Sequence, residues 1–427
     1  MPRKSKCLGR AKPRRRQPAD PRETGSWGAH GMNFELSNEQ RQIRSLCREF
    51  ATEVISPVAG QLDRDHAFGY EIVRQMGDLG FFGLPFPEQV GGQGGDFLSY
   101  CIAIEEISRA DSGVGITLEA AVSLGAAPIA NFGTAEQKAE LLPELLAGRK
   151  LWAFGLTEPD AGSDAGNTKT TAELRDGNWV INGAKQFITN TGTDISAGVT
   201  VTAATGEGRG GRREINAILV PRGTSGYGVG LSYRKLGWHS SDTHPLTFDN
   251  CVVPEASLLG RRGGGYQQFL HTLAGGRVAI AALCVGLAQA CLDASTSHAR
   301  ERIQFGRPIA SFQAIQFKLA DMAMEVELAR TMTYRAACSY EYGGESTSEF
   351  RRLASIAKLY ASETAKRAAD QAVQIHGGYG FIEDYPVARY YRDVKVTEIG
   401  EGTSEVQRML IARELDLFPN PQSMRGD

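Results

Sequence analysis

The periodicity of the sequence changes twice along the chain, and this pattern limits the possible folds more than any other feature. Residues 36–149 are rich in Ala, Glu and Leu, and their apolar positions recur at helical spacing. Residues 152–265 instead contain β-branched stretches, such as INAILVP and LTFDNCVVP, and an Asn182-Gly183 pair that predicts a hairpin turn. Helical spacing returns after the glycine cluster GRRGGGY. Helices, then strands, then helices predict an α+β protein with a central β domain.

We expect four segments, which are a disordered basic tail, a helical domain, a β domain and a helical bundle, at residues 1–31, 32–150, 151–265 and 266–427. The tail has nine Lys or Arg, two Asp or Glu, four prolines and few apolar residues, a composition that predicts disorder. The whole chain carries a net charge of −2 and the tail +7, so the remainder carries −9. A basic arm can bind nucleic acid, but an acidic body opposes phosphate binding, and we do not expect a nucleic-acid partner.

The cysteines and histidines argue against a bound metal. The seven cysteines form no CxxC pair, and the seven histidines are scattered. The longest apolar run, VAIAALCVGLA from Val278, has 11 residues, whereas a membrane span needs about 20. We therefore expect reduced thiols, neither a metal nor a membrane anchor, and a place in the cytoplasm or, for a eukaryotic protein, in the mitochondrial matrix.

Four polar segments punctuated by glycine are candidates for ligand binding, namely FGLTEPDAGSDA (154–165), KQFITNTG (185–192), RERIQFGRP (300–308) and QIHGGYGF (374–381). Hydroxyls, amides and an aromatic ring in the first two suit a planar heteroaromatic ligand, and arginines in the third suit a pyrophosphate. Each segment also has an ordinary interpretation, because loops, core strands, helix ends and C-caps produce the same patterns. GxGxxG spacing between a strand and a helix is absent, so a flavin would be held without a Rossmann fold.

Near the end of the chain, the segment EIGEGTSEVQR places Glu401 between two glycines. Glycine allows unusual backbone angles and lets another group come close to the main chain. Thr403 or Ser404 is expected to cap the following helix, with Ser404 and Gln407 spaced as a capping box. From these residues alone, Glu401 is either a favourable anion near a helix start or a catalytic carboxylate.

The order and spacing of these segments resemble the acyl-CoA dehydrogenase family, from about Leu36 to Leu417, and most closely its short-chain and short/branched-chain members. The matching motifs are FGLTEPDAGSDA, FIT, KLGWHSSDT, ARERIQFGRPI, FQAIQFKLADMAMEVE, QIHGGYGF and RDVKVTEIGEGTSEVQR. The resemblance implies an N-terminal helical domain, a central β-barrel-like domain and a C-terminal four-helix bundle. It also implies FAD as the cofactor, in a homotetramer in which FAD lies across a subunit interface.

The activity that the resemblance implies is α,β-dehydrogenation of short or branched-chain acyl-CoA thioesters to 2-enoyl-CoA. The electrons would pass to an electron-transfer flavoprotein. The residues implied to bind FAD are Phe154, Leu156, Thr157, Gly162, Ser163, Phe187, Ile188, Thr189, Arg302, Phe305, Gln313, Gln374, Gly377, Gly378, Thr403 and Glu405. Of these, Gln374 and the two glycines after it would reach FAD from a neighbouring subunit. The residues implied at the substrate are Ser163, Arg277, Gly400 and Gly402.

Glu401 matches the family's catalytic base, which removes the α-proton while hydride leaves the β-carbon. Its backbone N–H, with a flavin ribityl hydroxyl, would stabilise the enolate-like oxygen. In a dry pocket we expect the pKa of the carboxyl to rise toward the working pH. Some branched-chain members place the base immediately before the arginine that matches Arg277, but here that position is Gly276. Glu401 therefore has no rival.

Two departures from the family pattern leave the substrate open. Gly400 stands where the family often has a tyrosine, which predicts a wider pocket for branched or bulky acyl groups. Ala274 stands where close relatives often have an aspartate that contacts the CoA portion, so the substrate is either a CoA thioester or an acyl group on a carrier protein. The sequence is also compatible with an acyl-CoA oxidase on the same fold and with a DNA-associated relative, for which the basic tail is the only support.

Overall fold

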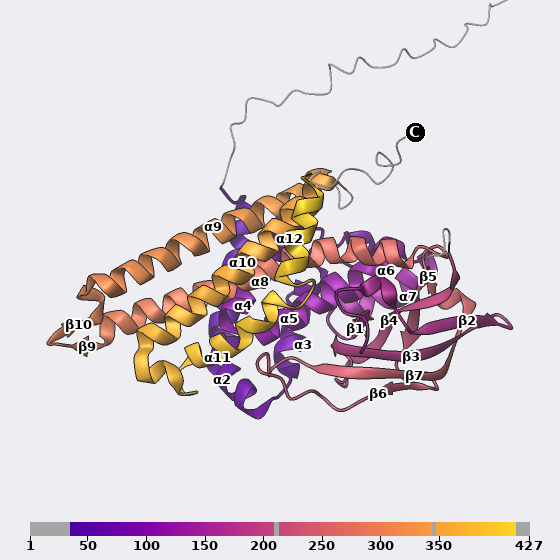
Figure 1. Cartoon of the computed structure of the whole chain (residues 1–427), viewed down its shortest axis with the longest axis horizontal. Helices are drawn as coiled ribbons and strands as arrows, with labels where there is room; N and C mark the ends of the chain where they lie inside the picture. Colours follow the sequence, from indigo (N-terminus) through magenta and orange to yellow (C-terminus); the bar gives the residue numbers. More distant parts are fainter. Residues whose placement is uncertain (1–34, 209–212, 344–346, 416–427) are drawn as a thin grey trace, which may run out of the picture.

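A computed structural model describes residues 35–208, 213–343 and 347–415 of the 427-residue chain. The predicted disordered tail, residues 1–31, lies outside these ranges. A helical N-terminal part, a sheet and a helical C-terminal part follow one another along the chain, as the sequence predicted. The sheet lies at one end of the molecule, and the long C-terminal helices run from it toward the opposite end (Figure 1).

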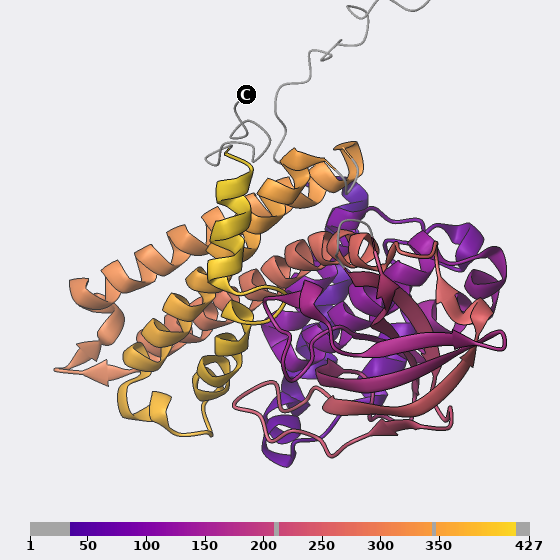
Figure 2. The same cartoon turned by 45° about the vertical axis from the view of Figure 1, so that its right-hand side comes forward.

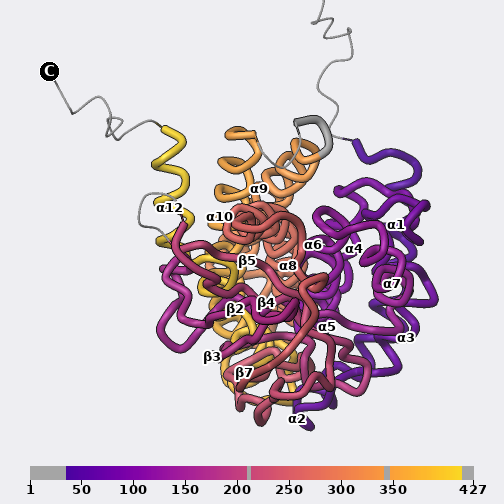
Figure 3. Tube along the Cα trace, turned by 90° about the vertical axis from the view of Figure 1, so that its right-hand side faces the viewer, coloured from indigo at the N-terminus to yellow at the C-terminus, as the bar shows by residue number. Residues whose placement is uncertain are grey.

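The N-terminal part packs beside the sheet, and together they form the wider end of the molecule (Figure 2). Two π-helical segments, η1 (Ala51–Ile55) and η4 (Ala120–Ala126), interrupt its helices. Seen from the sheet end, α1, α3 and α7 lie on one side of the molecule and α12 lies on the other (Figure 3). The α-helices of this part are α1 (Asn38–Phe50), α2 (Ser56–Asp65), α3 (Tyr70–Asp78), α4 (Phe97–Ala110), α5 (Ser112–Glu119), α6 (Ala127–Phe132) and α7 (Ala135–Leu146).

The described strands of the central part form one sheet, in the order β6-β7-β3-β2-β4-β5-β8, with β1 parallel to β4. Among the described strands, β6 pairs only with β7 and β8 only with β5, so the barrel-like sheet stays open. One face packs on a core of its own, which includes Trp179, Ile181 and Phe248. The strands are β1 (Leu151–Gly155), β2 (Thr171–Arg175), β3 (Asn178–Thr189), β4 (Ser196–Glu207), β5 (Arg213–Pro221), β6 (Tyr227–Val229), β7 (Thr243–Pro254) and β8 (Leu258–Leu259).

The predicted hairpin turn at Asn182-Gly183 is wrong, because both residues lie inside the long strand β3. The turn between β2 and β3 is instead Asp176-Gly177, where φ is +49° and +75°, as a two-residue hairpin of type I′ requires. Gly183 serves a close approach, because a Cβ there would lie 2.5 Å from Thr170 Oγ1. The two dipeptides give the same local signal, and only strand pairing distinguishes them.

The C-terminal part is built on three long helices, α8 (Gly265–Glu301), α9 (Gln313–Gly343) and α10 (Ser348–His376). A short hairpin, β9 (Ile303–Gln304) and β10 (Arg307–Pro308), joins α8 to α9. The shorter helices are α11 (Pro386–Val394) and α12 (Ser404–Arg413). Secondary structure changes between α7 and β1 and between β8 and α8, and the domain boundaries at 150 and 265 remain predictions.

Helix α8 passes through the main hydrophobic core, where its segment Val278–Ala288 is buried. Two helical stretches, Ser112–Phe132 and Gly265–Glu301, are long and apolar enough to cross a membrane by composition. Within their most apolar windows 83% and 78% of the residues are buried inside the protein, as in the core helices of globular proteins. At 1.5 Å per residue, the 37 residues of α8 span about 55 Å. Positions along this helix therefore give the distance between residues that pack near its two ends.

Candidate functional site

Glu401 lies in the loop before α12, and its backbone φ is +51°. A residue with a side chain rarely adopts this conformation, and such strain gathers at functional sites. The two flanking glycines differ in their purpose. Gly402 has a φ of +94°, and a Cβ there would lie 2.7 Å from Gln407 Nε2, whereas a Cβ at Gly400 would meet only Val396 O at 3.5 Å. The loop therefore requires glycine at 402, and position 400 has room for a side chain.

Thr403 is the N-cap of α12 and accepts a hydrogen bond from Val406 N at 3.2 Å. Of the two predicted caps, Thr403 or Ser404, the structure has Thr403, and the Ser404-Gln407 capping box is wrong. The Gln407 side chain donates instead to the carbonyl oxygens of Gly402 (2.9 Å) and Glu401 (3.3 Å). Gln407 is buried, so these two hydrogen bonds hold the Glu401 loop in place.

A second buried side chain anchors the same loop. Lys358, from the middle of α10, donates from Nζ to the carbonyl oxygen of Gly402 at 2.8 Å. Burial lowers the pKa of Lys358. A strained loop persists only where its surroundings over-determine it, and Lys358 and Gln407 supply that restraint.

The Glu401 carboxyl lies directly against α8 at Gly276. A Cβ on Gly276 would lie 2.2 Å from Glu401 Oε2, so any larger residue there would displace the carboxyl. The next residue, Arg277, is buried, and its burial lowers its pKa to about 10 against the attraction of Glu401. The structure thus brings together the predicted base and the predicted substrate arginine, with the glycine that makes room for the base.

Burial raises the pKa of Glu401 to about 7, while the Arg277 charge, a hydrogen bond from Glu119 and the Lys358 charge act in the opposite direction. Apart from the Glu119 carboxyl, no group in residues 35–208, 213–343 and 347–415 forms a hydrogen bond with either Glu401 oxygen. A general base works best when its pKa lies near the operating pH and a lone pair is free. Glu401 meets both conditions.

Glu119, at the end of α5, is a site residue that the sequence analysis missed. Its side chain is fully buried (0% exposed), and it interacts with Glu401. The available signal was a lone acidic residue in the apolar helical run GVGITLEAAVSLGAAPI. Acidic residues are almost never fully buried without a partner, so this glutamate indicated a buried polar contact from another part of the chain.

The loop after β1 is fixed against β3, which brings together the first two predicted FAD segments. The carbonyl oxygen of Thr157 accepts a hydrogen bond from Gln186 N at 2.8 Å. Lys185, fully buried, donates to Leu156 O at 3.1 Å and to Glu158 Oε1 at 2.7 Å. Burial lowers the pKa of Lys185 to about 8 against the attraction of Glu158. This buried ion pair positions the loop, whereas Gly162 and Ser163 beyond it are exposed.

Two aromatic side chains mark this region. Phe154, at the end of β1, stacks on Phe269 in the first turns of α8, with ring centroids 6.2 Å apart and planes within 9°. Phe187 has a φ of +61° where the β3–β7 pairing shifts register, and 65% of its surface is exposed. Its neighbour Ile188 is buried in the core of the sheet, and Thr189 is half-buried. A strained, exposed phenylalanine at this position suits contact with a planar ligand.

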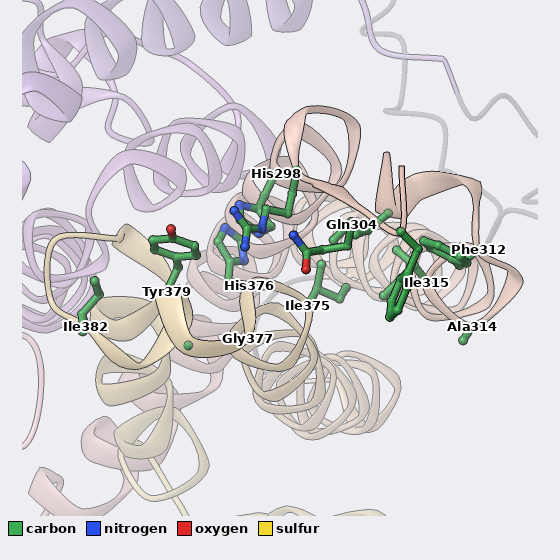
Figure 4. A pocket seen from close by; sticks show the side chains of 14 residues that line it. His298, Gln304, Phe312, Ala314, Ile315, Ile375, His376, Gly377, Tyr379 and Ile382 are labelled. Atoms are coloured by element: carbon green, nitrogen blue, oxygen red, sulfur yellow. The ribbon is translucent and has the colours of Figure 1, made fainter. Parts of the chain in front are cut away.

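A further group of predicted FAD residues lines a cavity of about 750 Å³ (Figure 4), at the far end of the helical bundle. We call this cavity the end pocket. His298, His376 and Tyr379 lie side by side along it, and the centroids of the two histidine rings are 4.2 Å apart. The predicted residues that line it are Arg302, Phe305, Gly377 and Gly378. Gln313 is exposed at the start of α9, and Gln374 is exposed in the last turn of α10.

The end pocket is open and bears a cation beside aromatic rings. The guanidinium carbon of Arg302 lies 5.1 Å from the centre of the Tyr379 ring. Phe305 has a φ of +54° and is 93% exposed. Cβ atoms on Gly377 and Gly378 would meet nothing within 4 Å, so bare backbone faces open space there. Phosphate and an aromatic base are ligands that such a surface can bind.

Positions along α8 show that the predicted residues form two separate groups. Gly276, against Glu401, lies 7 residues from Phe269, which corresponds to about 10 Å along the axis. Arg302 lies 33 residues from Phe269, or about 50 Å. One dinucleotide cannot touch both Phe154 and Arg302 of a single chain. Thr403 and Glu405 belong to the Glu401 group, and their contacts with a cofactor remain predictions.

Comparisons with known proteins agree with this geometry. Sequence models of the acyl-CoA dehydrogenase N-terminal, middle and C-terminal domains match residues 37–149, 153–251 and 263–415. The chain is 50% identical over 384 residues to the probable acyl-CoA dehydrogenase YngJ of Bacillus subtilis, covering 90% of this chain and 100% of that protein.

Two solved structures share the fold over almost the whole described chain. Butyryl-CoA dehydrogenase from Megasphaera elsdenii is 42% identical with a TM-score of 0.86, covering 90% of this chain and 100% of that one. A chain from a study of the electron transferring flavoprotein of Acidaminococcus fermentans is also 42% identical with a TM-score of 0.86, covering 91% and 100%.

Proposed function

Because the chain belongs to the acyl-CoA dehydrogenase family, we propose that it converts short or branched-chain acyl-CoA thioesters to 2-enoyl-CoA and passes the electrons to an electron-transfer flavoprotein. The chain is an FAD-dependent oxidoreductase of the short-chain type. The acyl group and the electron acceptor are the parts that we propose. We place the activity in the cytoplasm, or in the mitochondrial matrix of a eukaryote.

The observation that carries the proposal is the buried Glu401 carboxyl, with a free lone pair and a pKa near 7. An oxygen of Glu401 accepts the α-proton of the thioester. The Glu401 N–H makes no hydrogen bond within the described part of the chain, so it is free to donate to the thioester oxygen as charge develops. Lys358 and Gln407 hold the loop, so that both groups keep their positions during the reaction.

The residues around β1 and β3 fit a flavin ring, which when bound supplies the acceptor for the hydride of the β-carbon. Exposed Phe187 offers an apolar surface, and the Leu156–Thr157 loop is already fixed beside it by Lys185 and Gln186. The end pocket fits the adenosine and phosphate end of the same cofactor. Since about 50 Å separates the two groups within one chain, we propose that each FAD is shared by two protomers of a homotetramer.

Exposed apolar side chains around the end pocket support this arrangement. Phe305 and Phe381 are 93% and 87% exposed, and Ile303 is also exposed. Large apolar side chains gathered at one place mark interaction surfaces. A neighbouring subunit would cover them and place the adenosine and phosphate end of its own FAD in the end pocket.

Anaerobic titration of the purified flavoprotein with butyryl-, isobutyryl- and 2-methylbutyryl-CoA tests the proposed function. We expect the visible flavin band to bleach with at least one thioester, and the order of the three reports acyl preference. A flavin that stays oxidised with all three would overturn the proposal and favour a carrier-protein thioester. Hydrogen peroxide formed at the rate of turnover would identify an oxidase instead.

Position 400 tests the branched-chain part of the proposal. Gly400 leaves space beside Glu401, because a Cβ there would make only an ordinary contact with Val396 O. We expect Gly400→Tyr to lower kcat/KM for 2-methylbutyryl-CoA by about 10-fold relative to butyryl-CoA, the discrimination that one methyl group allows. Equal effects on both thioesters would remove the link between Gly400 and branching.

A further inference from the structure

Glu119 ends helix α5 at the point where the backbone changes to the π-helix η4. π-Helical turns are rare and occur often at functional sites, since they alter the direction of a side chain. The Glu119 side chain is fully buried, and the side chains that act on its carboxyl by hydrogen bonding are Glu401 and Ser123. A buried acidic group with so few partners is costly unless it serves a purpose.

The groups around Glu119 come from α4, η4, α8, α10 and the loop before α12. The hydroxyl of Tyr100 is used by Glu119 O (3.3 Å) and Ser123 Oγ (3.0 Å), so it does not reach the carboxyl. Lys358 is committed to Gly402 O at 2.8 Å. Among the nearby cations, Arg277 lowers the pKa of Glu401 the most. Glu401 is therefore the ionisable group that faces the Glu119 carboxyl.

Two carboxyls in contact away from water cannot both be ionised. The Ser123 hydroxyl acts on the Glu119 carboxyl, and one proton held between Glu119 and Glu401 satisfies one oxygen on each side. Burial and the Glu401 charge raise the pKa of Glu119 well above its ordinary value, and the hydrogen bond from Glu119 acts to lower that of Glu401. Glu401 thus ionises first, and Glu119 keeps the proton.

We propose that Glu119 is a positioning residue for the proposed dehydrogenation, which remains protonated and donates its hydrogen to one oxygen of Glu401, leaving the other oxygen free for the α-proton. When Glu401 accepts that proton, both carboxyls are protonated and no charge is left unpaired between them. One proton leaves Glu401 after the product departs. This inference rests on the proposed function only for the origin of the proton that Glu401 accepts.

Infrared difference spectroscopy of the full-length flavoprotein tests the shared proton without any substrate. With carbon-13 glutamate labelling, we expect a band of a protonated buried carboxyl at pH 8 in the wild type. The band is expected to disappear in Glu119→Gln and to persist in the control Glu105→Gln, which removes the other buried glutamate, paired with Arg330 at 2.9 Å. Absence of the band in the wild type would overturn the proposal, even if every thioester bleaches the flavin.

Two substitutions separate the donor role from a purely structural one. Glu119→Gln keeps a hydrogen-bond donor and cannot titrate, so kcat and the acidic limb of the kcat/KM profile are expected to stay within about threefold of wild type. Glu119→Leu removes the donor, and we expect kcat to fall about 10–100-fold, with little change in KM and an acidic limb shifted to higher pH. Flavin content and melting temperature report folding.

Equal activities and pH profiles for the two variants would contradict the proposal. If Glu119→Leu does not fold, the infrared band and the pH profile of Glu119→Gln still test whether Glu119 holds the shared proton. A flavin that no thioester reduces, together with a band lost in Glu119→Gln, would keep the carboxyl pair and overturn only the dehydrogenase reaction.

Discussion

The Glu401 site and the end pocket lie about 40 Å apart along α8, at residues 276 and 302, and they differ in how they are completed. The Glu401 carboxyl is buried, its loop is held by two buried side chains, and its neighbours come from four helices of the same chain. The end pocket is open, and it exposes Phe305 and bare backbone at Gly377. The side chains around the Glu401 carboxyl thus come from one chain alone, whereas we propose that a second copy completes the end pocket.

Backbone strain occurs in both regions, but its compensation differs. At Glu401, with φ of +51°, the restraint comes from Lys358 and Gln407 through buried hydrogen bonds. At Phe305 it comes from the hairpin itself, because Phe305 and Gly306 form the two-residue turn between β9 and β10 with φ of +54° and +76°. Asparagine or glycine is preferred at such a position, so a phenylalanine there supports our proposal that its exposed ring contacts the cofactor.

The largest expected effect separates the two regions by function. Glu401→Gln removes the base, and we expect kcat to fall by about 10⁴-fold, the upper range for general base catalysis. Flavin content and subunit association should stay at wild-type levels, because the end pocket is unchanged. Stopped-flow flavin reduction and size-exclusion chromatography measure the two properties.

Glu398→Gln is the matched control, since Glu398 lies three residues earlier and its carboxylate pairs with the exposed Lys395 at 2.6 Å. We expect its rate to stay within about threefold of wild type. If Glu398→Gln lost as much activity as Glu401→Gln, charge in this segment, rather than the position of one carboxyl, would explain the effect.

Glu401→Gln should also stabilise the folded protein at alkaline pH. The folded-state pKa of Glu401, about 7, lies above its unfolded value, so its contribution to stability is complete below about pH 4 and is lost as pH rises through 7. Glu401→Gln avoids this loss. We expect its melting temperature relative to wild type to be higher at pH 8 than at pH 5, by the equivalent of up to about 3 kcal/mol. A difference that does not depend on pH would mean that Glu401 is not buried as a raised-pKa acid.

In the end pocket, Arg302→Ala should weaken the retention of FAD by about 10–100-fold while leaving Glu401 in place. The measurement is flavin content after gel filtration at several protein concentrations. Arg300→Ala is the control, because Arg300 is exposed two residues earlier and does not line the pocket. Loss of flavin in both variants would assign the effect to general charge rather than to the pocket.

The smallest expected effect concerns the anchor of the Glu401 loop. Lys358→Met removes the hydrogen bond to Gly402 O, and we expect kcat to fall about 10-fold with little change in KM. Lys366→Met, on the exposed face of the same helix, should leave kcat unchanged. A raised KM with unchanged kcat would show that Lys358 supports substrate binding and not the position of the base.

Much of the architecture could be predicted from local patterns. Helical and strand periodicities determined the order of the three parts, and two glycines around one glutamate marked Glu401. Local patterns failed where two sites give the same signal, as at Asn182-Gly183, and where a cap residue forms a longer-range contact, as Gln407 does. They also missed Glu119, because its partner lies 282 positions away along the chain.

The sequence by itself determined the order of helical and strand segments, the family resemblance and the choice of Glu401 as the proposed base, since these depend on residues close together in the chain. Only the tertiary structure decided which carboxyl faces Glu401, why position 276 is glycine, and that the predicted FAD residues form two groups about 50 Å apart. The physical reason is that burial, charge coupling and distance arise from packing between distant segments, which no local pattern records.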